Sequence, residues 1–505
     1  MILCSTMLYV QSCKKWDDHV ALPQQQLSET LLENLEKDPQ MSSFISYARQ
    51  TGLDSLLSAS KNITVFAPTN DALASIPNHI KSDLVLLKKY IQNHISVGAY
   101  FLRDAVDSFR VPVLNGKNIF FINKKFDDAN IISADIYLSN GVLHKIDKAI
   151  EPQQNIWEFI NSSKNEYIQN QYISSLTYRV QDPNLAEIDS INPNTGLPVY
   201  KPGTGFVTRN TFNTKVYDIS NEDSLYTYIL LTDNAFNLEK NRLAPYYKSR
   251  NSDTADLNAK WGVVKDFSVK GLYNESNLPA MLLSKFGVNI QMNKSSIVST
   301  QKLSNGIVYI MNAASTQLQE RIPVVYIEGI NPFTFNISNS TPVFYRHRMN
   351  PLTGIPFQDI YVNLGTGSGG ANRSIGYYTN QLNTTKYKVY MMSVNDKVIS
   401  GVADGTYGTD SSLNHTVRIT SRSNMTDTLF NQSVDITPNT YNEFYLGEFT
   451  NDEYNWLFSH PTSLPSGIQY NRHEGTRYIW LISPATATNR PYNLTLNYLR
   501  LEPVF

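Results

Sequence analysis

Residues that could perform catalysis are few and widely spaced in this chain. Its eight histidines form no His-x-x-x-His pair of the kind that holds a zinc ion on one helix face. The chain also has no Gly-x-Ser-x-Gly elbow and no phosphate-binding P-loop, so the motifs of zinc proteases, α/β-hydrolases and nucleotidases are missing. A polysaccharide hydrolase stays open as an alternative, because the separation of two carboxylates cannot be read from a sequence.

Two polar segments match ligand-binding motifs in part. Gly365–Gly370 fits the dinucleotide pattern Gly-x-Gly-x-x-Gly, but the β-prone Ile375–Tyr378 follows where a phosphate-binding helix must begin. We therefore interpret this segment as a loop. Asp404 and Asp410 could lend oxygen ligands to a structural calcium ion. No other cofactor is expected.

Length and charge limit the classes of protein that fit. The 505 residues suggest roughly three domains. Charged residues make up only 17%, aromatic residues 11%, and the net charge is −1. A chain without a basic field has little to attract phosphates, so we expect no nucleic-acid partner.

The N-terminal segment contains a candidate localisation signal. An apolar run ends at Ser12-Cys13 and resembles the lipobox of bacterial lipoproteins. The resemblance implies that Cys13 is acylated and that residues 1–26 are signal and tether. Asp17 and Asp18 resemble the export signal of surface lipoproteins from glycan-importing Gram-negative species. We therefore expect a lipid-anchored protein exposed on the outer membrane.

Further along the chain, one pattern occurs twice. Thr64–Leu73 (TVFAPTNDAL) recurs in looser form as Thr227–Phe236, and Leu138–Leu143 (LSNGVL) recurs as Leu303–Val308. Order and spacing are kept, which indicates a duplicated domain.

The elements around the first copy of this pattern can be predicted from local signals. Asp38-Pro39 reads as a helix start, and Gly52 reads as the end of that helix. A buried strand should follow over Ile63–Ala67, with a second helix near Leu86–Ile95. The remaining predicted strands are Lys117–Asn123, Ala134–Ser139 and Val142–Asp147.

TVFAPTNDAL, NHISVGAYF around His94 and ADIYLSNGVLHKID together resemble the fasciclin-type domain. The resemblance implies a compact α+β fold used mostly in adhesion, over residues 27–152. Residues 153–318 keep only the anchor segments, with Phe267 in the place of His94 and a long insertion over 185–215. We therefore predict a degenerate second copy.

The conspicuous polar residues of the two copies have structural explanations. We predict helix capping, a hydrogen-bonded core histidine and tight Asn-Gly hairpin turns of type I′. The residues concerned are Thr69, Asn70, Asp71, His94, Asn140, Gly141, Asn305 and Gly306.

From about Val324 onward, short strand-like runs alternate with turn clusters, which is typical of a β-sandwich. The predicted strands are Tyr387–Ser393, His415–Ser421, Tyr441–Phe449, Arg477–Ser483 and Tyr492–Leu501. Lys386–Tyr390 and Leu494–Pro503 resemble strands of jelly-roll carbohydrate modules. The fold class is thus two fasciclin-type α+β domains followed by a jelly-roll-like β-sandwich over 319–505.

A sugar ligand would need aromatic rings for its apolar face and planar polar groups for its hydroxyls. Trp480 lies in an apolar run and is predicted to be part of the core. The predicted glycan-binding residues are therefore Trp456, Tyr470, Asn471, Arg472 and Glu474.

Together these observations favour a non-enzymatic outer-membrane lipoprotein for adhesion or glycan capture. By analogy it would be an accessory subunit beside a TonB-dependent transporter and its surface lipoprotein, with polysaccharide as ligand. The alternatives are a purely structural protein-docking subunit and a polysaccharide hydrolase.

Overall fold

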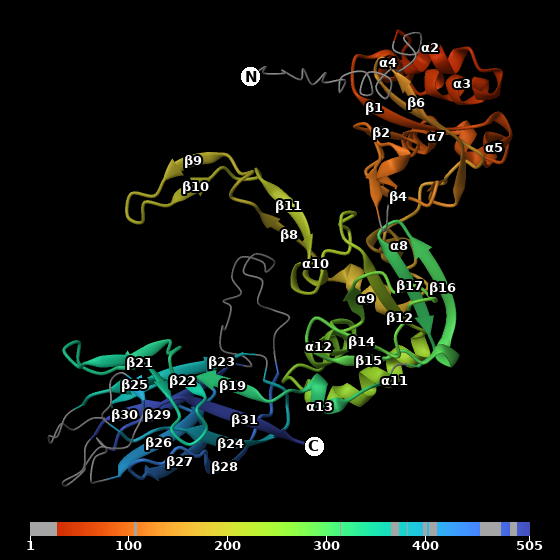
Figure 1. The fold of residues 1–505 in the computed structure, drawn as a ribbon. Coiled ribbons are helices and arrows are strands. Elements are labelled where there is room, and N and C mark those ends of the chain that lie inside the picture. The colour runs from red at the N-terminus through yellow and green to blue at the C-terminus, as the bar shows by residue number, and fades with distance from the viewer. Residues whose placement is uncertain are drawn as a thin grey trace, which may run out of the picture. The chain divides into compact units, whose positions relative to one another are not determined.

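The computed structural model describes residues 28–105, 109–313, 315–364, 373–380, 382–396, 401–402, 412–454, 476–484 and 492–505. The chain folds into two compact units (Figure 1). One contains the residues up to 159 with 219–226 and 301–308, and the other contains 160–218, 227–300 and 309–505. The domain boundaries predicted from the sequence remain a prediction. Among the helices in the described ranges, we find none whose length and apolar character would suit a membrane span.

Short, well-capped helices open the first unit. Thr30 and Glu33 form a reciprocal capping box, and Asp38 accepts a hydrogen bond from the amide of Gln40 just after Pro39. The following helix buries Phe44, Ile45 and Ala48 on one face. The helices are α2 (Leu31–Glu36), η1 (Pro39–Met41), α3 (Ser42–Gln50), α4 (Asp54–Ser58), α5 (Asn70–Ala74), α6 (Asn78–Ser82), α7 (Leu84–Gln92) and η2 (Leu102–Asp104).

A seven-stranded sheet of order β2-β1-β7-β6-β5-β4-β3 completes this unit. All six residues of β1 are buried, because it pairs with parallel β7 on one side and antiparallel β2 on the other. The predicted second helix ends earlier than expected, since Ile95 already belongs to β2. The strands are β1 (Ile63–Pro68), β2 (Ile95–Val97), β3 (Arg110–Pro112), β4 (Asn118–Ile122), β5 (Lys125–Phe126), β6 (Ala129–Leu138) and β7 (Gly141–Ile146).

The strand order β2-β1-β7-β6 of the first copy recurs in the second copy as β13-β12-β17-β16. Its strands β13, β12, β17 and β16 form a four-stranded sheet, and β14, β15 and β18 form a three-stranded one. The helices are α8 (Ile156–Ser162), α9 (Ile168–Ser175), α10 (Thr211–Lys215), α11 (Asp233–Leu243), η3 (Ala244–Tyr246), α12 (Ser252–Val264), η4 (Lys294–Ser296) and α13 (Leu318–Arg321). The strands are β12 (Tyr226–Leu231), β13 (Ser268–Lys270), β14 (Met281–Leu283), β15 (Asn289–Gln291), β16 (Ile297–Leu303), β17 (Gly306–Met311) and β18 (Ser315–Thr316).

Equivalent hydrogen bonds confirm the duplication. The Thr64 hydroxyl donates to the carbonyl of Gly98 at 2.8 Å, and the Thr227 hydroxyl donates to the carbonyl of Gly271 at 2.9 Å. Both threonines begin the repeated motif. The second copy is therefore a true structural counterpart of the first, despite its loosened sequence.

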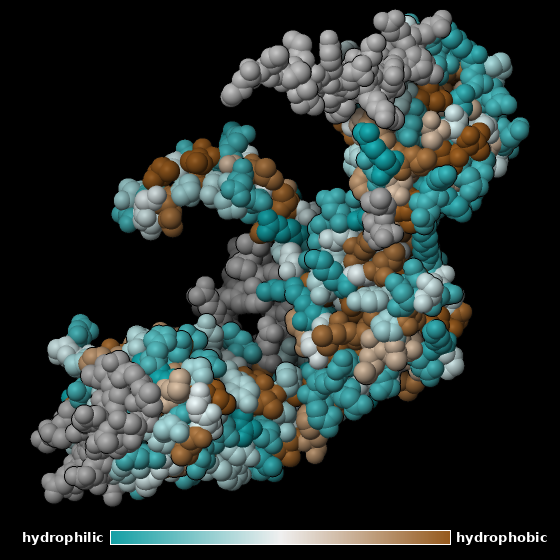
Figure 2. Space-filling model, viewed as in Figure 1, coloured by the Kyte–Doolittle hydropathy of each residue, from teal (hydrophilic) through white to brown (hydrophobic). Residues whose placement is uncertain are grey.

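The predicted insertion, residues 185–215, forms part of two β-ribbons that begin before it, at Thr177. Strands β8 (Thr177–Gln181) and β11 (Phe206–Asn210) make one antiparallel pair, and β9 (Ile188–Ile191) and β10 (Pro198–Tyr200) make another. Apolar side chains gather along this arm (Figure 2). Leu185 and Leu197 are more than half exposed.

The C-terminal part is a β-sandwich, as predicted. Its sheets have the orders β19-β31-β24-β28, β20-β23-β29-β26-β27 and β25-β21-β22-β30. Inward-pointing side chains of these strands share one hydrophobic core. The strands are β19 (Val325–Glu328), β20 (Thr334–Asn336), β21 (Val343–Met349), β22 (Pro356–Val362), β23 (Ser374–Thr379), β24 (Lys386–Met392), β25 (Gly401–Val402), β26 (Leu413–Thr420), β27 (Thr428–Ile436), β28 (Phe444–Thr450), β29 (Arg477–Ile482), β30 (Leu494–Leu496) and β31 (Tyr498–Val504).

One predicted strand is divided. The run Tyr492–Leu501 forms β30 and β31, which belong to different sheets. Asn497 lies between them, and its amide nitrogen donates to the carbonyl of Met392 at 2.9 Å. The chain thus crosses from one sheet to another where a continuous strand was expected.

Candidate functional site

The residues directly after β1 cap helix α5 and form a hydrogen bond between α5 and α3. The Thr69 hydroxyl accepts a hydrogen bond from the amide of Ala72, which confirms the predicted cap of α5. The Asn70 side chain accepts from the amide of Ser43 at 2.8 Å and so fixes the start of α3. Asp71 is exposed in the first turn of α5, where a carboxylate is favoured by the helix dipole. None of the three faces a cavity that we can identify in the described part of the chain.

His94 is a core histidine, as predicted. Its side chain is wholly buried, with Nδ1 lying 3.0 Å from the carbonyl oxygen of Tyr90. Nε2 accepts a hydrogen bond from the amide of Ile150 at 2.9 Å, so the proton must lie on Nδ1. Burial lowers the pKa of His94 to about 4, although the hydrogen bond to Tyr90 opposes this shift. A buried, fully bonded imidazole has no free position for a ligand or a substrate proton.

Asn140 holds three backbone groups of separate segments. Its side-chain oxygen accepts from the amide of Leu31 at 2.8 Å, and its side-chain nitrogen donates to the carbonyls of Leu57 and Ala59 at 2.8 and 2.9 Å. Asn305 repeats this arrangement in the second copy, where it accepts from the amide of Ile156 at 2.9 Å. Through these hydrogen bonds, the two asparagines hold the neighbouring helices and loops against the β6–β7 and β16–β17 hairpin turns.

The two Asn-Gly pairs do form hairpins, but the predicted type I′ geometry is wrong. Asn140 and Asn305 do not have positive φ, and Gly141 and Gly306 are the first residues of their strands. Glycine is needed for another reason. A Cβ on Gly141 would lie 1.9 Å from the carbonyl oxygen of Ile63, and one on Gly306 would meet an equivalent carbonyl at 2.0 Å. Close backbone approach, rather than turn chemistry, explains these glycines.

Phe267 takes the backbone position of His94, as predicted. The amide of Phe66 donates to the His94 carbonyl at 2.8 Å, and the amide of Ile229 donates to the Phe267 carbonyl at 2.9 Å. The second copy thus keeps the fold without the imidazole, which supports a structural role for His94 in the first.

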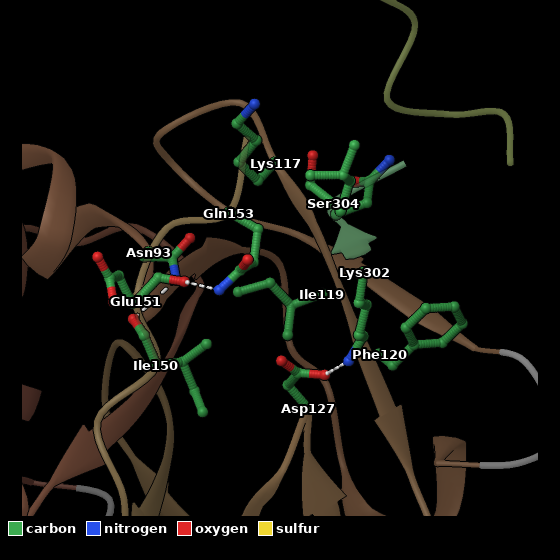
Figure 3. Close-up of a pocket in the computed structure, with 12 residues that line it drawn as sticks. Asn93, Lys117, Ile119, Phe120, Asp127, Ile150, Glu151, Gln153, Lys302 and Ser304 are labelled. Carbon is green, nitrogen blue, oxygen red and sulfur yellow. Dashed lines mark hydrogen bonds and ion pairs between the residues drawn. The ribbon is translucent and has the colours of Figure 1, made fainter. Parts of the chain in front are cut away.

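A pocket in the first unit lies among β4, Asp127 and the segments 150–153 and 302–304 (Figure 3). Lys302 forms an ion pair with Asp127 at its edge, and the Gln153 side chain donates to the carbonyl of Glu151 at 3.4 Å. The cavity holds about 30 Å³, which is room for roughly one water molecule. It is too small for a sugar ring.

Several predicted site residues lie outside the described residues, so their roles stay predictions. They are Cys13, Asp17, Asp18, Asp404, Asp410, Trp456, Tyr470, Asn471, Arg472 and Glu474. The segment Gly365–Gly370 also falls there. Across the ranges that the structure does describe, no group of three or more His, Cys, Asp or Glu side chains could hold a metal ion.

Trp480 is buried, but its predicted place in the sandwich core is wrong. Its neighbours Ile479 and Leu481 enter that core, whereas Trp480 alternates to the other face of β29 and packs in a separate cluster with Tyr478 and Ile482. It is 4% exposed, and its indole N–H donates to the Thr420 hydroxyl at 3.2 Å. Phe333 packs against it with ring centroids 5.6 Å apart. Trp480 itself therefore presents little surface to a ligand.

Sequence reasoning missed a second aromatic group on the outer face of the sheet β19-β31-β24-β28. Tyr326, Arg500, Tyr390 and Tyr445 are paired residue to residue across its four strands. Tyr326 and Tyr445 are 55% and 56% exposed. The alternation of polar and apolar residues in Lys386–Tyr390 is a local signal that one side of this strand faces solvent. Only the strand register, however, places the four residues in a row.

Comparisons with known proteins point to one family. A family model for the fasciclin domain matches residues 39–152. Protein sll1483 of Synechocystis sp. is 35% identical over 133 residues, which cover 24% of this chain and 73% of that protein. Human periostin is 27% identical over 173 residues, which cover 30% of this chain and 20% of periostin. The pig transforming growth factor-beta-induced protein ig-h3 is 25% identical over 25% of this chain and 20% of its own length. The chain thus spans about a fifth of these two animal proteins.

Two solved structures are also similar. The FAS1 domain pair from the insect cell adhesion molecule Fasciclin I matches 56% of this chain and 99% of its own, with 13% identity and a TM-score of 0.23. A family 35 carbohydrate binding module from Clostridium thermocellum matches 36% of this chain and 99% of its own, with 12% identity and a TM-score of 0.19.

Proposed function

This chain belongs to the fasciclin-domain family, and from that membership we propose that it is a non-enzymatic, adhesion-type protein displayed on a bacterial surface. Fasciclin domains imply an adhesion-type role. The observation that carries the proposal is the 35% identity to a relative of which 73% is covered.

The placement of the motif residues supports a scaffold rather than an enzyme. The side-chain amides of Asn140 and Asn305 form hydrogen bonds with backbone groups, and Thr69 caps a helix. His94 is neutral, buried and bonded at both ring nitrogens. Polar groups used in this way stabilise a fold and are not presented to a substrate.

Display at the cell surface rests on the N-terminal segment. Acylation of Cys13 would anchor the protein through buried methylene groups at about 0.8 kcal/mol each. Asp17 and Asp18 would direct it to the outer face of the outer membrane. The β-sandwich would then meet a polysaccharide, beside a TonB-dependent transporter and its surface lipoprotein.

Labelling of cells with radioactive palmitate, followed by protease shaving of intact cells, tests anchoring and exposure together. We expect label in the wild-type protein, no label in Cys13→Ala, and loss of the wild-type protein on shaving. Replacement of Asp17 and Asp18 by asparagine should keep the label but protect the protein from protease. An unlabelled protein recovered in the cytosol would overturn the proposal.

The two other functions are separated by assays on the full-length protein. Retardation in polysaccharide-containing gels supports glycan capture, whereas co-purification with a transporter without retardation favours a docking subunit. Release of reducing ends, abolished by one Asp or Glu substitution, would establish a hydrolase instead.

A further inference from the structure

We propose that the outer face of the sheet β19-β31-β24-β28 binds an uncharged polysaccharide, with Tyr326 and Tyr445 as its two stacking platforms. This inference rests on the glycan-capture part of the proposed function and names its site. It also moves the site away from Trp456 and Tyr470, the aromatic residues that the sequence favoured.

Strand alternation turns one side chain of every two toward solvent on this face. Ile327, Val389 and Leu501 are buried in the core. Their neighbours Tyr326 and Arg500 point the other way, because successive side chains of a strand alternate between faces. The face is therefore an aromatic surface on a strand framework whose other side is fully packed.

A β-bulge brings the fourth residue into the row. The pairing of β24 with β28 shifts between Val389 and Tyr390, so that Tyr390 lies opposite Tyr445 and Val389 lies opposite Gly447. Gly447 has a φ of +131°, which a residue with a side chain rarely adopts. Without the bulge, the apolar Leu446 would stand beside Tyr390. The extra residue thus aims Tyr445 at solvent.

Ring contacts hold both platforms in place. Tyr445 packs on Tyr390 with centroids 5.3 Å apart, and Tyr326 meets Tyr498 edge to face at 5.4 Å. The Arg500 guanidinium lies 3.9 Å from the centroid of Tyr390, so these two residues form a floor between the platforms. Rings fixed in this way lose little conformational entropy when a ligand stacks on them.

The charges on this face cancel locally. Glu443 receives two hydrogen bonds from Arg500, at 2.8 and 2.7 Å, and Glu502 pairs with the third guanidinium nitrogen. These hydrogen bonds from Arg500 lower the pKa of the Glu443 carboxyl. The same face carries Lys386, which pairs with Glu448 at 3.3 Å, and Lys388, which lies opposite Glu448 and Glu502 in the strand register. These cations do not outnumber the carboxylates, so the face offers no surplus of positive charge to a uronate or sulfate group. A neutral glycan fits this balance, whereas an acidic one would be repelled.

The dimensions and chemistry suit an extended sugar chain. Tyr326 and Tyr445 stand on the outer strands of the sheet, three inter-strand spacings or about 14 Å apart. The apolar face of a pyranose can stack on each ring, while its hydroxyls can reach the carboxylates of Glu443 and Glu502. Two platforms separated by a polar floor therefore favour a polymer over a single sugar.

Affinity gel electrophoresis of the full-length protein tests this site. The neutral probes are hydroxyethyl cellulose, galactomannan and dextran, and the charged probes are carboxymethyl cellulose and dextran sulfate. We expect at least one neutral polymer to retard the protein, and Tyr326→Ala/Tyr445→Ala to weaken its affinity at least ten-fold. Tyr378→Ala is the matched control, because Tyr378 is 51% exposed on the other sheet. Melting temperatures show whether each variant is folded.

The possible results distinguish a failure of the tyrosine site from a failure of the proposed function. Neutral binding that survives the double variant would overturn the tyrosine face and leave glycan capture standing. Binding only to the charged polymers would overturn the assignment to neutral glycans. If no polymer retards the wild-type protein, the site and glycan capture both fail, and surface display is still judged by the shaving experiment. A protein partner lost in the double variant, without polymer binding, would likewise replace the sugar site.

Discussion

His144 and Tyr309 make the same hydrogen bond in the two fasciclin copies. His144 Nε2 lies 2.9 Å from the carbonyl oxygen of Tyr100, and the Tyr309 hydroxyl donates to the carbonyl oxygen of Tyr273 at 2.7 Å. The amide of Asp135 donates to His144 Nδ1 at 3.3 Å, which leaves the imidazole proton on Nε2. Burial lowers the pKa of His144 and raises that of Tyr309, so both rings stay neutral. The chemistry of the residue changed during divergence while its structural task was kept.

Tyr309→Phe should weaken the second copy slightly. The variant keeps the ring but removes the donor to the Tyr273 carbonyl, which costs about 1 kcal/mol of unfolding free energy. Amide hydrogen exchange in β17 measures this loss. Tyr378→Phe, at an exposed tyrosine, should change exchange in β17 by nothing measurable.

Asn140→Ala should destabilise the first copy much more strongly. The substitution leaves one amide and two carbonyls without their partner, and we expect a loss on the order of 3 kcal/mol in urea unfolding. Asn305→Ala should cost a similar amount in the second copy. Asn194→Ala, at an exposed turn, is the control. An equal loss of stability in this variant would contradict the stabilising role of the Asn140 hydrogen bonds.

Gly141→Ala should disturb the junction of β7 with β1. Its new methyl group would collide with the Ile63 carbonyl, and neither backbone can move without breaking strand pairing, so we expect a loss of about 3 kcal/mol. Gly116→Ala has open space around its Cβ and carries only the conformational cost of φ +84°, about 1–2 kcal/mol. Thermal unfolding of both variants compares the two costs.

The first copy should lose stability between pH 6.5 and 4. Burial lowers the pKa of His94 to about 4, so the unfolded chain binds a proton in this window that the folded chain does not. The stabilisation is complete above about pH 6.5 and falls by roughly 3 kcal/mol as the pH drops to 4. Urea titrations at pH 7, 6 and 5 should show this slope. His94→Phe, which introduces the residue found at Phe267 in the second copy, should reduce this slope, and an unchanged slope would refute the assignment. Part of the slope that remains comes from His144, whose pKa is also lowered by burial.

Arg321→Met should strongly destabilise the second unit. Arg321 is wholly buried, and its Nη1 lies 2.8 Å from a carboxylate oxygen of Asp266, which is buried as well. Removal of the cation leaves that carboxylate uncompensated, which costs about 3–5 kcal/mol. Arg209→Met breaks an exposed pair with Asp182 and should cost less than about 1 kcal/mol. Adding Asp266→Asn to Arg321→Met should restore part of the loss in denaturant unfolding.

Much of the secondary structure could be predicted because its signals are local. The start at Asp38-Pro39, the cap at Thr69 and the buried strand from Ile63 depend on a few neighbouring residues. The single run Tyr492–Leu501 was misjudged, because an apolar stretch does not say which sheet each part of it joins.

The roles of single residues were harder to predict where the partners are distant in sequence. Asn140 reads as a turn residue because Asn-Gly favours hairpins, yet its amide binds Leu31, 109 residues away. Likewise, the clash that requires Gly141 involves Ile63, on a neighbouring strand. Local propensity cannot report such contacts.

The duplicated fasciclin motif, the alternation of the C-terminal strands and the burial of Trp480 can all be read from the sequence, since repetition and periodicity are properties of the chain. The common face of Tyr326, Arg500, Tyr390 and Tyr445 is visible only in the folded protein. Strand register, with the bulge at Gly447, brings together residues from four distant segments. That register comes from packing the whole core, so no short stretch of sequence contains it.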